Sequence, residues 1–252
     1  EQNTIGVAAG LALTGKIVYV YSIIPFVIMR CFEQVRLDLA YNETNVKLVG
    51  IGAGMTYGPL GPSHHGIEDI AIMRAIPNMT VLCPGDPIET SELIKRSYEN
   101  EGPMYIRLGK NGEPNINSEG TRVEIGKSIQ ITDGEDLALI STSNTLELAK
   151  QWVDEWKEEG INVQLISMPS MKPFDKNCID ELIAKKIPIF TIEEHNIIGG
   201  LGSAVAEIIA ESGQSMKFKR IGINDTFSHH IGNHNYQREK FGLLKKPNFS
   251  NE

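Results

Sequence analysis

The sequence IPIFTIEEHNIIGGLGSAVAEIIAE, residues 187–211, contains one complete strand–turn–helix unit. Its first six residues are mostly apolar and β-branched, which predicts a buried strand over 187–192. Residues 202–211 carry small and apolar side chains at helical spacing and predict a helix. The segment between them, Glu193–Ser203, is first polar and then glycine-rich, as a short connection from strand to helix requires. Units of this kind build the sheets of α/β proteins.

The same alternation of strand and helix extends along the chain in both directions. We expect strands at residues 16–21, 46–52, 80–83, 104–108, 137–141, 163–167, 187–192 and 216–221. We expect helices at residues 1–13, 25–41, 67–75, 87–99, 145–159, 176–185 and 202–211, and a short one ending near 244. Strands separated by helices pair in parallel. The polar segment 111–119 predicts a linker, so the sequence predicts an α/β fold of two parallel-sheet domains, residues 1–115 and 116–252.

Composition and charge exclude several classes of protein. The 252 residues are 41% hydrophobic, which excludes global disorder, and the net charge of −8 argues against a nucleic-acid binder. We expect no membrane span, because no apolar run approaches 18 residues. Cys31, Cys83 and Cys178 form neither a disulfide framework nor a CxxC motif, so we expect buried thiols and a cytoplasmic location.

Two local features could carry chemistry at a site. His64 and His65 lie in the loop GPSHHG, just before a predicted helix, where α/β proteins often bind ligands. These histidines either act on a ligand by proton transfer or only satisfy backbone groups of the loop. Glu1 precedes the apolar run GVAAGLAL, so its carboxyl is either poorly solvated with a raised pKa, or belongs to a simple helix N-cap or a frayed terminus.

Two further features have a structural reading beside a functional one. Glu193–Ser203 lacks the third glycine and the acidic partner of a dinucleotide fingerprint, so it is either a ligand loop or a closely packed crossover. His229, His230 and His234 are near one another in the sequence, and the last two could share a helical face. No cysteine or carboxylate cluster accompanies them, so we predict no metal site there.

Together these segments resemble the C-terminal half of transketolase and its thiamine diphosphate-dependent relatives, over essentially the whole chain. Six segments match the family in the family's order: Glu1-Gln2-Asn3 with GVAAGLAL, the helix from Phe26 to Arg36, Gly61–His65, Ala75–Met79, Met171–Asp175 and Glu193–Ser203. The resemblance implies two α/β domains, a pyrimidine-binding domain and a transketolase C-terminal domain. The pyrimidine-binding domain of the family has a further strand and helix before this glutamate, so we expect residues 1–115 to be N-terminally incomplete.

The resemblance also implies roles for individual residues. Glu1 matches the glutamate whose carboxyl gives a proton to the aminopyrimidine ring of the cofactor. Phe26 would stack on that ring, and Arg30 lies on the same segment and would contact the cofactor. His64 would face the substrate and hydrogen-bond the donor's oxygen, with His65 beside it.

Two basic residues are the candidates for binding a substrate phosphate. Lys110 lies where the family often has a phosphate-binding arginine, and Arg107 is a second cation in the same segment. Three departures from the family pattern concern this region: Leu60 replaces an acidic residue, Gly52 replaces a phosphate-contacting histidine, and Lys110 is a point charge rather than a bidentate group. The pattern predicts an intact cofactor site and an altered sugar-phosphate site.

The family binds the diphosphate and its Mg²⁺ through a G-D-G…N motif on another domain, and this sequence has none. We therefore expect a split, transketolase-like transferase of carbohydrate metabolism whose diphosphate-binding half is a partner subunit, assembled as a heterotetramer. It would move a two-carbon ketol unit from a ketose donor to an aldehyde acceptor. The alternatives are a subunit like 1-deoxyxylulose-phosphate synthase or a 2-oxo acid dehydrogenase beta subunit, and a structural homologue without catalytic function.

Overall fold

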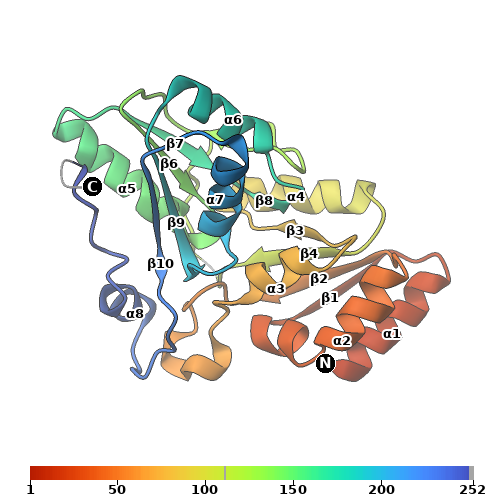
Figure 1. The fold of residues 1–252 in the computed structure, drawn as a ribbon. Helices are drawn as coiled ribbons and strands as arrows, with labels where there is room; N and C mark the ends of the chain where they lie inside the picture. Colours follow the sequence, from red (N-terminus) through yellow and green to blue (C-terminus); the bar gives the residue numbers. More distant parts are fainter. Residues whose placement is uncertain (111, 250–252) are drawn as a thin grey trace.

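The computed structural model describes residues 1–110 and 112–249, which fold around two five-stranded sheets (Figure 1). We call residues 1–110 the first half and residues 112–249 the second half. Asn111, the first residue of the predicted linker, and residues 250–252 of the predicted second domain lie outside the described residues. Within them, no helix is long and apolar enough to span a membrane.

The first sheet has the strand order β1-β2-β4-β3-β8. Its parallel strands are β1 (Val18–Ile23), β2 (Val46–Ile51), β3 (Thr80–Leu82) and β4 (Met104–Leu108). The α-helices of this half are α1 (Gln2–Leu13), α2 (Phe32–Gln34), α3 (Asp69–Ala75) and α4 (Pro87–Glu99). Asp86 begins α4 as its N-cap by accepting a hydrogen bond from the Glu89 N–H, and Pro87 occupies the first turn.

The second sheet has the strand order β10-β9-β6-β7-β5. Its strands are β5 (Ile129–Gln130), β6 (Leu137–Ser141), β7 (Val163–Ser167), β9 (Ile189–Asn196) and β10 (Phe218–Ile223). The helices of this half are α5 (Leu146–Glu158), α6 (Lys176–Lys185), α7 (Leu201–Ser212) and α8 (His234–Lys240). Trp152 and Trp156 of α5 pack edge to face in the core beside this sheet.

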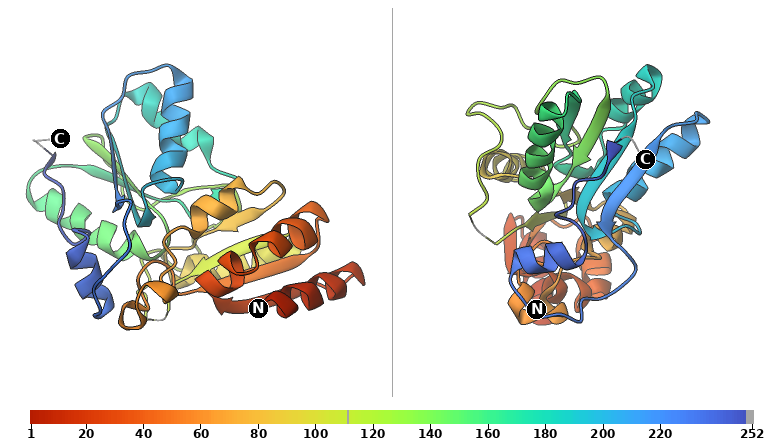
Figure 2. Two further views of the ribbon diagram at one scale, coloured as in Figure 1. Left: turned by 60° about the horizontal axis from the view of Figure 1, so that its bottom comes forward. Right: turned by 90° about the vertical axis from the view of Figure 1, so that its left-hand side faces the viewer.

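One strand of the second half completes the sheet of the first. The strand β8 (Ser170–Lys172) pairs antiparallel with β3, and the Lys172 ammonium donates to the carbonyls of Arg74 and Ile76. One hydrophobic cluster contains Val81 and Met79 from the first half together with Met168 and Ile179 from the second. The two halves therefore share a core, and Figure 2 shows them in contact from two further directions.

The α/β class and the parallel order of the long strands agree with the sequence prediction, but the sheet edges and the predicted helix 25–41 differ. Each sheet ends in a short antiparallel strand, β5 or β8, which the sequence pattern did not predict. The predicted helix 25–41 is instead a π-helical turn at Pro25–Met29, the short α2 and a second π-helical turn at Val35–Tyr41. The first widened turn is closed by the Arg30 N–H, which donates to the Pro25 carbonyl.

The predicted linker is tied to the protein along part of its length. The backbone N–H groups of Ile116 and Asn117 both donate to the Asp86 carboxylate, and the Asn117 side chain donates to Asp86 and Glu89. Asn117 is consequently buried. A polar segment that predicted a free linker is thus held by a buried acceptor that lies 30 residues earlier in the chain.

Candidate active site

The first half brings three of the predicted residues together at the carboxyl end of its sheet. Glu1 precedes α1, Phe26 lies in the π-helical turn after β1, and His64 lies in the loop after β2. The Phe26 and His64 rings meet edge to face with their centroids 5.1 Å apart. The Arg30 guanidinium lies 4.9 Å from the centre of the Phe26 ring and donates to the Glu1 carboxylate at 3.1 Å. An acid, an aromatic ring and an imidazole therefore share one edge of the sheet.

Glu1 is less buried than the apolar run after it predicted. Its side chain is 26% exposed, and Ser22 and Arg30 donate to its two oxygens. The following helix buries only Ile5, Ala8 and Ala9, because its other apolar side chains face outward. The expectation of a desolvated carboxyl is wrong for this chain alone.

Arg107 is not a free cation for a substrate phosphate, and that prediction is wrong. Its side chain is 1% exposed and forms a buried ion pair with Asp69 at 2.9 Å. The same guanidinium donates to the backbone carbonyls of Gly66 and Glu194. All three acceptors lie far from Arg107 in the sequence, so only the fold reveals that this arginine braces the start of α3.

His65 also turns away from the open edge. Its side chain is buried, and burial lowers its pKa from the usual value. The charge of Glu194 acts on the His65 ring, whereas His64 is half-buried and its ring meets Phe26 edge to face. Of the two histidines, only His64 is part-exposed at the open edge.

Lys110 is exposed and lies beside Tyr57, a residue that no sequence motif singled out. The Lys110 ammonium is 5.6 Å from the centre of the Tyr57 ring, and the Tyr57 ring meets His64 edge to face at 6.4 Å. Tyr57 covers Gly52, where an added Cβ would collide with the tyrosine ring. The sequence showed only that residue 52 is a glycine; that Tyr57 fills the space above it is visible in the fold alone.

A buried ionic network in the second half anchors the loop that carries His64. The Glu194 carboxylate accepts hydrogen bonds from the Met55 N–H at 2.6 Å, from Arg238 at 2.5 Å and from His234 at 2.7 Å. Arg238 also donates to the Asn144 carbonyl. Burial alone would raise the pKa of Glu194, but Arg238 and His234 hold that pKa well below its usual range.

The other members of the glycine-rich signature are structural. The Glu193 carboxylate accepts the N–H groups of Leu201 and Gly202 at the start of α7, and burial raises its pKa to about 7. Burial lowers the pKa of His195 to about 4. Gly200 packs so closely on Glu193 that a side chain there would collide with the carboxylate. The reading of a closely packed crossover therefore fits this segment.

His234 begins α8, whereas His230 lies before the helix, so the two do not share a helical face. Across residues 1–110 and 112–249, no group of three or more His, Cys, Asp or Glu side chains is arranged to hold a metal ion. Cys31 and Cys83 are buried and Cys178 is half-buried; burial raises the pKa of all three thiols.

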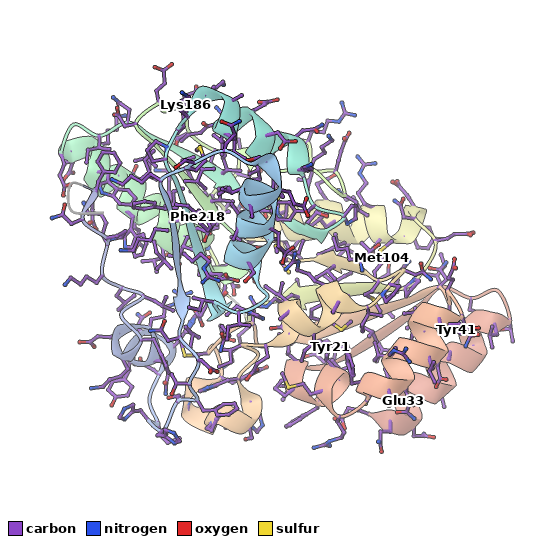
Figure 3. The ribbon with its side chains drawn as sticks, in the orientation of Figure 1. Tyr21, Glu33, Tyr41, Met104, Lys186 and Phe218 are labelled. Carbon is purple, nitrogen blue, oxygen red and sulfur yellow. The ribbon has the colours of Figure 1, made fainter. Side chains whose placement is uncertain are left out.

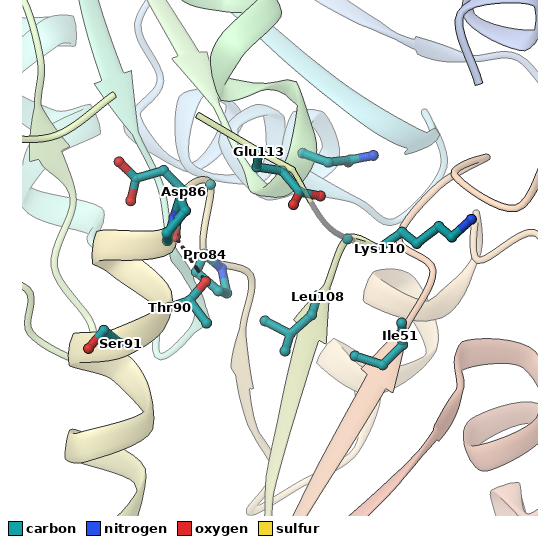
Figure 4. Close-up of a pocket in the computed structure, with 12 residues that line it drawn as sticks. Ile51, Pro84, Asp86, Thr90, Ser91, Leu108, Lys110 and Glu113 are labelled. Atoms are coloured by element: carbon teal, nitrogen blue, oxygen red, sulfur yellow. Dashed lines mark hydrogen bonds between the residues drawn. The ribbon is translucent and has the colours of Figure 1, made fainter. Parts of the chain in front are cut away.

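A pocket of about 350 Å³ lies beyond the carboxyl ends of β2 and β4 (Figure 4). Ile51 and Leu108 form its apolar wall, and Asp86 and Thr90 of the α4 start lie opposite. Lys110 borders the pocket, but its side chain runs away from Asp86 toward the loop that follows β2. The pocket therefore adjoins the candidate site without containing its aromatic cluster.

The fold and the site define a two-sheet α/β protein that presents an acid, a ring and an imidazole at an open edge. A family model described as "Transketolase, pyrimidine binding domain" matches residues 1–114, and one described as "Transketolase, C-terminal domain" matches residues 126–244. The chain belongs to the transketolase family.

Similar proteins include a transketolase section and two transketolase subunits. A "Putative transketolase C-terminal section" of Methanocaldococcus jannaschii is 47% identical over 231 residues, covering 90% of this chain and 72% of the relative. An apulose-4-phosphate transketolase subunit of Actinobacillus succinogenes is 37% identical, covering 96% and 78%. A 6-deoxy-6-sulfo-D-fructose transketolase subunit of Clostridium sp. is 36% identical, covering 98% and 76%.

A solved structure described as "Split gene transketolase, inactive beta4 tetramer" is 37% identical to this chain and superposes with a TM-score of 0.89. The match covers 96% of this chain and 77% of the solved chain. The structural similarity therefore includes both sheets.

Proposed function

We propose that this chain is the C-terminal subunit of a split transketolase that moves a two-carbon ketol unit from a ketose to an aldehyde. In that reaction one carbon–carbon bond of the donor breaks and one forms to the acceptor. The observation that carries the proposal is the convergence of Glu1, Phe26 and His64 at one open edge of the first sheet, in a chain similar to transketolase subunits.

The donor set at this edge fits the pyrimidine end of thiamine diphosphate. When bound, the cofactor supplies a nucleophilic carbon and an electron sink. Glu1 would hold a proton at its carboxyl for the pyrimidine ring, and Phe26 would stack on that ring. Arg30 already contacts both residues and would orient them. His64, at the edge of Phe26, would hydrogen-bond the donor's oxygen.

Within the described residues, the same edge offers no carboxylate cluster for the Mg²⁺ that accompanies a diphosphate. No acidic metal-ligand group occurs in the part of the chain that the structure describes, and Arg30 is the cation beside Phe26. We therefore assign the diphosphate and the Mg²⁺ to a partner subunit, whose binding would also cover Glu1. Covering that carboxyl would supply the desolvation that the single chain lacks.

The outer surface of the first half is suited to that partner. Exposed apolar side chains follow α1 and the edge strand β1: Val7, Leu11, Leu13, Tyr19 and Tyr21. Tyr21 and Tyr41 are 71% and 77% exposed, and Figure 3 shows Tyr41 on the side of this half away from the second half. An exposed apolar surface beside an incomplete site favours association, and we propose a heterotetramer of two catalytic halves.

The proposal is tested by mixing this chain with its diphosphate-binding subunit, thiamine diphosphate and Mg²⁺. We expect ketol transfer from a ketose to an aldehyde in the mixture and none with either subunit alone. Decarboxylation of pyruvate without ketol transfer would contradict the proposal and favour a synthase-like or dehydrogenase-like subunit. A mixture that binds the cofactor but catalyses neither reaction would favour a structural homologue.

We further propose a cytoplasmic location, on the ground that all three cysteines are free thiols, which is typical of a reducing compartment. Fractionation of the source cells with an antibody to this chain would test it. Recovery in a membrane or extracellular fraction would contradict the proposal.

A further inference from the structure

Tyr57 is the one aromatic side chain that contacts both His64 and Lys110 among the ring contacts of the described residues. It lies in the loop Ala53–His65, just before a turn of 3₁₀ helix at Gly58–Leu60. Its ring is half-buried, so part of it faces the open edge. The neighbours of Tyr57 indicate what this tyrosine contributes beside the proposed catalytic histidine.

The first reason is steric. Gly52 has a φ of +93°, and a Cβ there would overlap the Tyr57 ring. The ring therefore fills the space that a side chain at residue 52 would use. The loop follows the end of β2, and the phenol ring of Tyr57 lies over Gly52, which has no side chain.

The second reason is electrostatic. The Lys110 ammonium lies 5.6 Å from the centre of the Tyr57 ring, within the range of a cation–π contact. Lys110 is exposed, and its long side chain would otherwise be free to move. Tyr57 thus holds a single positive charge on the side of the site next to His64.

The loop itself is rigidly held. The Met55 N–H donates to the buried Glu194 carboxylate, and Gly58 packs against the carbonyl of Gly232 in the second half. Gly61 lies against Ile231 of the same segment. A residue on such an anchored loop can contribute to recognition without the entropic cost of ordering the loop.

We infer that Tyr57 is a specificity-determining residue that, with Lys110, receives a terminal oxyanion of the ketose. The inference rests on the proposed function, because it places that oxyanion at the end of the sugar remote from the carbon unit that moves. One phenolic O–H and one ammonium suit a single tetrahedral oxyanion group, either a phosphate or a sulfonate. The exposed apolar side chain of Leu60, on the same loop, offers no charge to a sugar hydroxyl.

The test uses the complex of this chain with its diphosphate-binding subunit and three donors: a ketose phosphate, the matching sulfonate and the uncharged ketose. For Tyr57→Phe we expect KM for the charged donors to rise about 10-fold, as loss of a hydrogen bond to a charged group predicts, with kcat within about twofold. KM for the uncharged ketose should not change. The donor with the larger rise identifies phosphate or sulfonate as the group that is read.

Two further variants separate recognition from folding. Lys110→Met should remove most of the preference for charged donors, and Tyr57→Leu should raise KM less in the Lys110→Met background than alone, because the two residues act as a pair. Tyr98→Phe, on the exposed face of α4, is the matched control and should match the parent. The thiamine diphosphate concentration for half-activation should be the same in all of them.

An unchanged KM for charged donors in Tyr57→Phe would overturn the inference while leaving the proposed function standing. If the complex transfers no ketol unit at all, the proposed function fails and the inference is decided by binding. Inorganic phosphate and sulfate are then titrated into the chain, with the amide NMR shifts of Lys110 and of the non-proline residues of 52–64 as the readout. A saturable shift that is lost in both Tyr57→Phe and Lys110→Met supports an oxyanion site; its absence in the parent overturns it.

Discussion

The two sheets have the same plan, parallel strands with one short antiparallel edge strand, yet the proposed site residues of the first half and the signature carboxylates of the second half lie in different surroundings. In the first half, Glu1, Phe26 and His64 lie at an open edge and are part-exposed. In the second half, Glu193 and Glu194 are buried near the end of a strand, and each carboxylate is fully engaged. Polar residues near the ends of strands can therefore belong to an active site or to a buried network that stabilises the fold. The burial of their side chains distinguishes the two.

The largest expected effect is on catalysis in the first half. Glu1→Gln should lower kcat of the partnered complex by about 10²–10⁴-fold, because the amide cannot hold a transferable proton. Its folding should be unaffected, since the carboxylate is part-exposed and its pair with Arg30 lies at the surface. Steady-state kinetics and thermal denaturation of the same sample check both statements. A variant that keeps full activity would show that the open edge is not the active site.

The next effect is on stability and belongs to the second half. Glu194→Ala should lower the free energy of unfolding by about 3–5 kcal/mol, because it leaves the Arg238 guanidinium buried without its charge partner. Urea denaturation measures the change. Glu207→Ala is the matched control, since Glu207 pairs with Arg74 at an exposed position and should cost less than about 1 kcal/mol. Equal losses of unfolding free energy in the two variants would contradict the distinction between a buried ion pair that stabilises the fold and an ion pair at the surface.

A smaller effect concerns cofactor affinity. Phe26→Ala should weaken thiamine diphosphate binding by the partnered complex by about 10-fold, because it removes one stacking surface. Phe227→Ala removes an equally large, exposed ring from the second half and should leave the affinity unchanged. Isothermal titration of each complex gives the dissociation constants. A larger loss in Phe227→Ala than in Phe26→Ala would place the cofactor elsewhere.

The smallest expected effect is a pH dependence of the stability, caused by the buried carboxyl group of Glu89. Burial raises the pKa of Glu89 from 4.5 to about 7. The folded state therefore binds more protons between these values, so this group's stabilisation is full below pH 4.5 and is lost as pH rises through 7. The Gly85 N–H and the Asn117 amide each donate to one Glu89 oxygen, so the NH2 group of Glu89→Gln meets a donor and costs stability at every pH. Relative to the parent, Glu89→Gln should nevertheless gain a few degrees in Tm between acid pH and about pH 8, because only the parent loses stability over that range.

Glu92→Gln, at a more exposed position of α4, is the control and should not reproduce that pH-dependent gain. The buried Glu193, whose pKa is also raised to about 7, leaves a residual slope of the same sign in Glu89→Gln. A gain in Glu89→Gln that grows toward acid pH would mean that the sign assigned to Glu89 is wrong.

The sequence predicted the long strands because each is a buried apolar run. Met104–Leu108, Leu137–Ser141 and Val163–Ser167 were placed correctly to the residue. The edge strands β5 and β8 were missed because they have two and three residues, too few for any pattern. Their pairing depends on contacts with distant strands, which no local window contains.

At the site, the sequence identified residue types but not their surroundings. Arg107 was predicted to bind the substrate, because the sequence around it does not reveal its ion-pair partner. That partner, Asp69, lies 38 residues earlier, and nothing local shows that the pair is buried. Tyr57 was overlooked because a single aromatic residue in a glycine-rich loop has no periodicity. The role that we propose for Tyr57 is argued from the space above Gly52 and from Lys110, which meet only in the folded chain.

The central claim is that this chain carries one half of a cofactor site and a partner carries the other. Calorimetric titration of thiamine diphosphate with Mg²⁺ into this chain, into the diphosphate-binding subunit and into their equimolar mixture tests it directly. The account predicts full-affinity binding only in the mixture, and weaker binding in the Phe26→Ala mixture. Binding by this chain alone, at the affinity of the mixture, would contradict it.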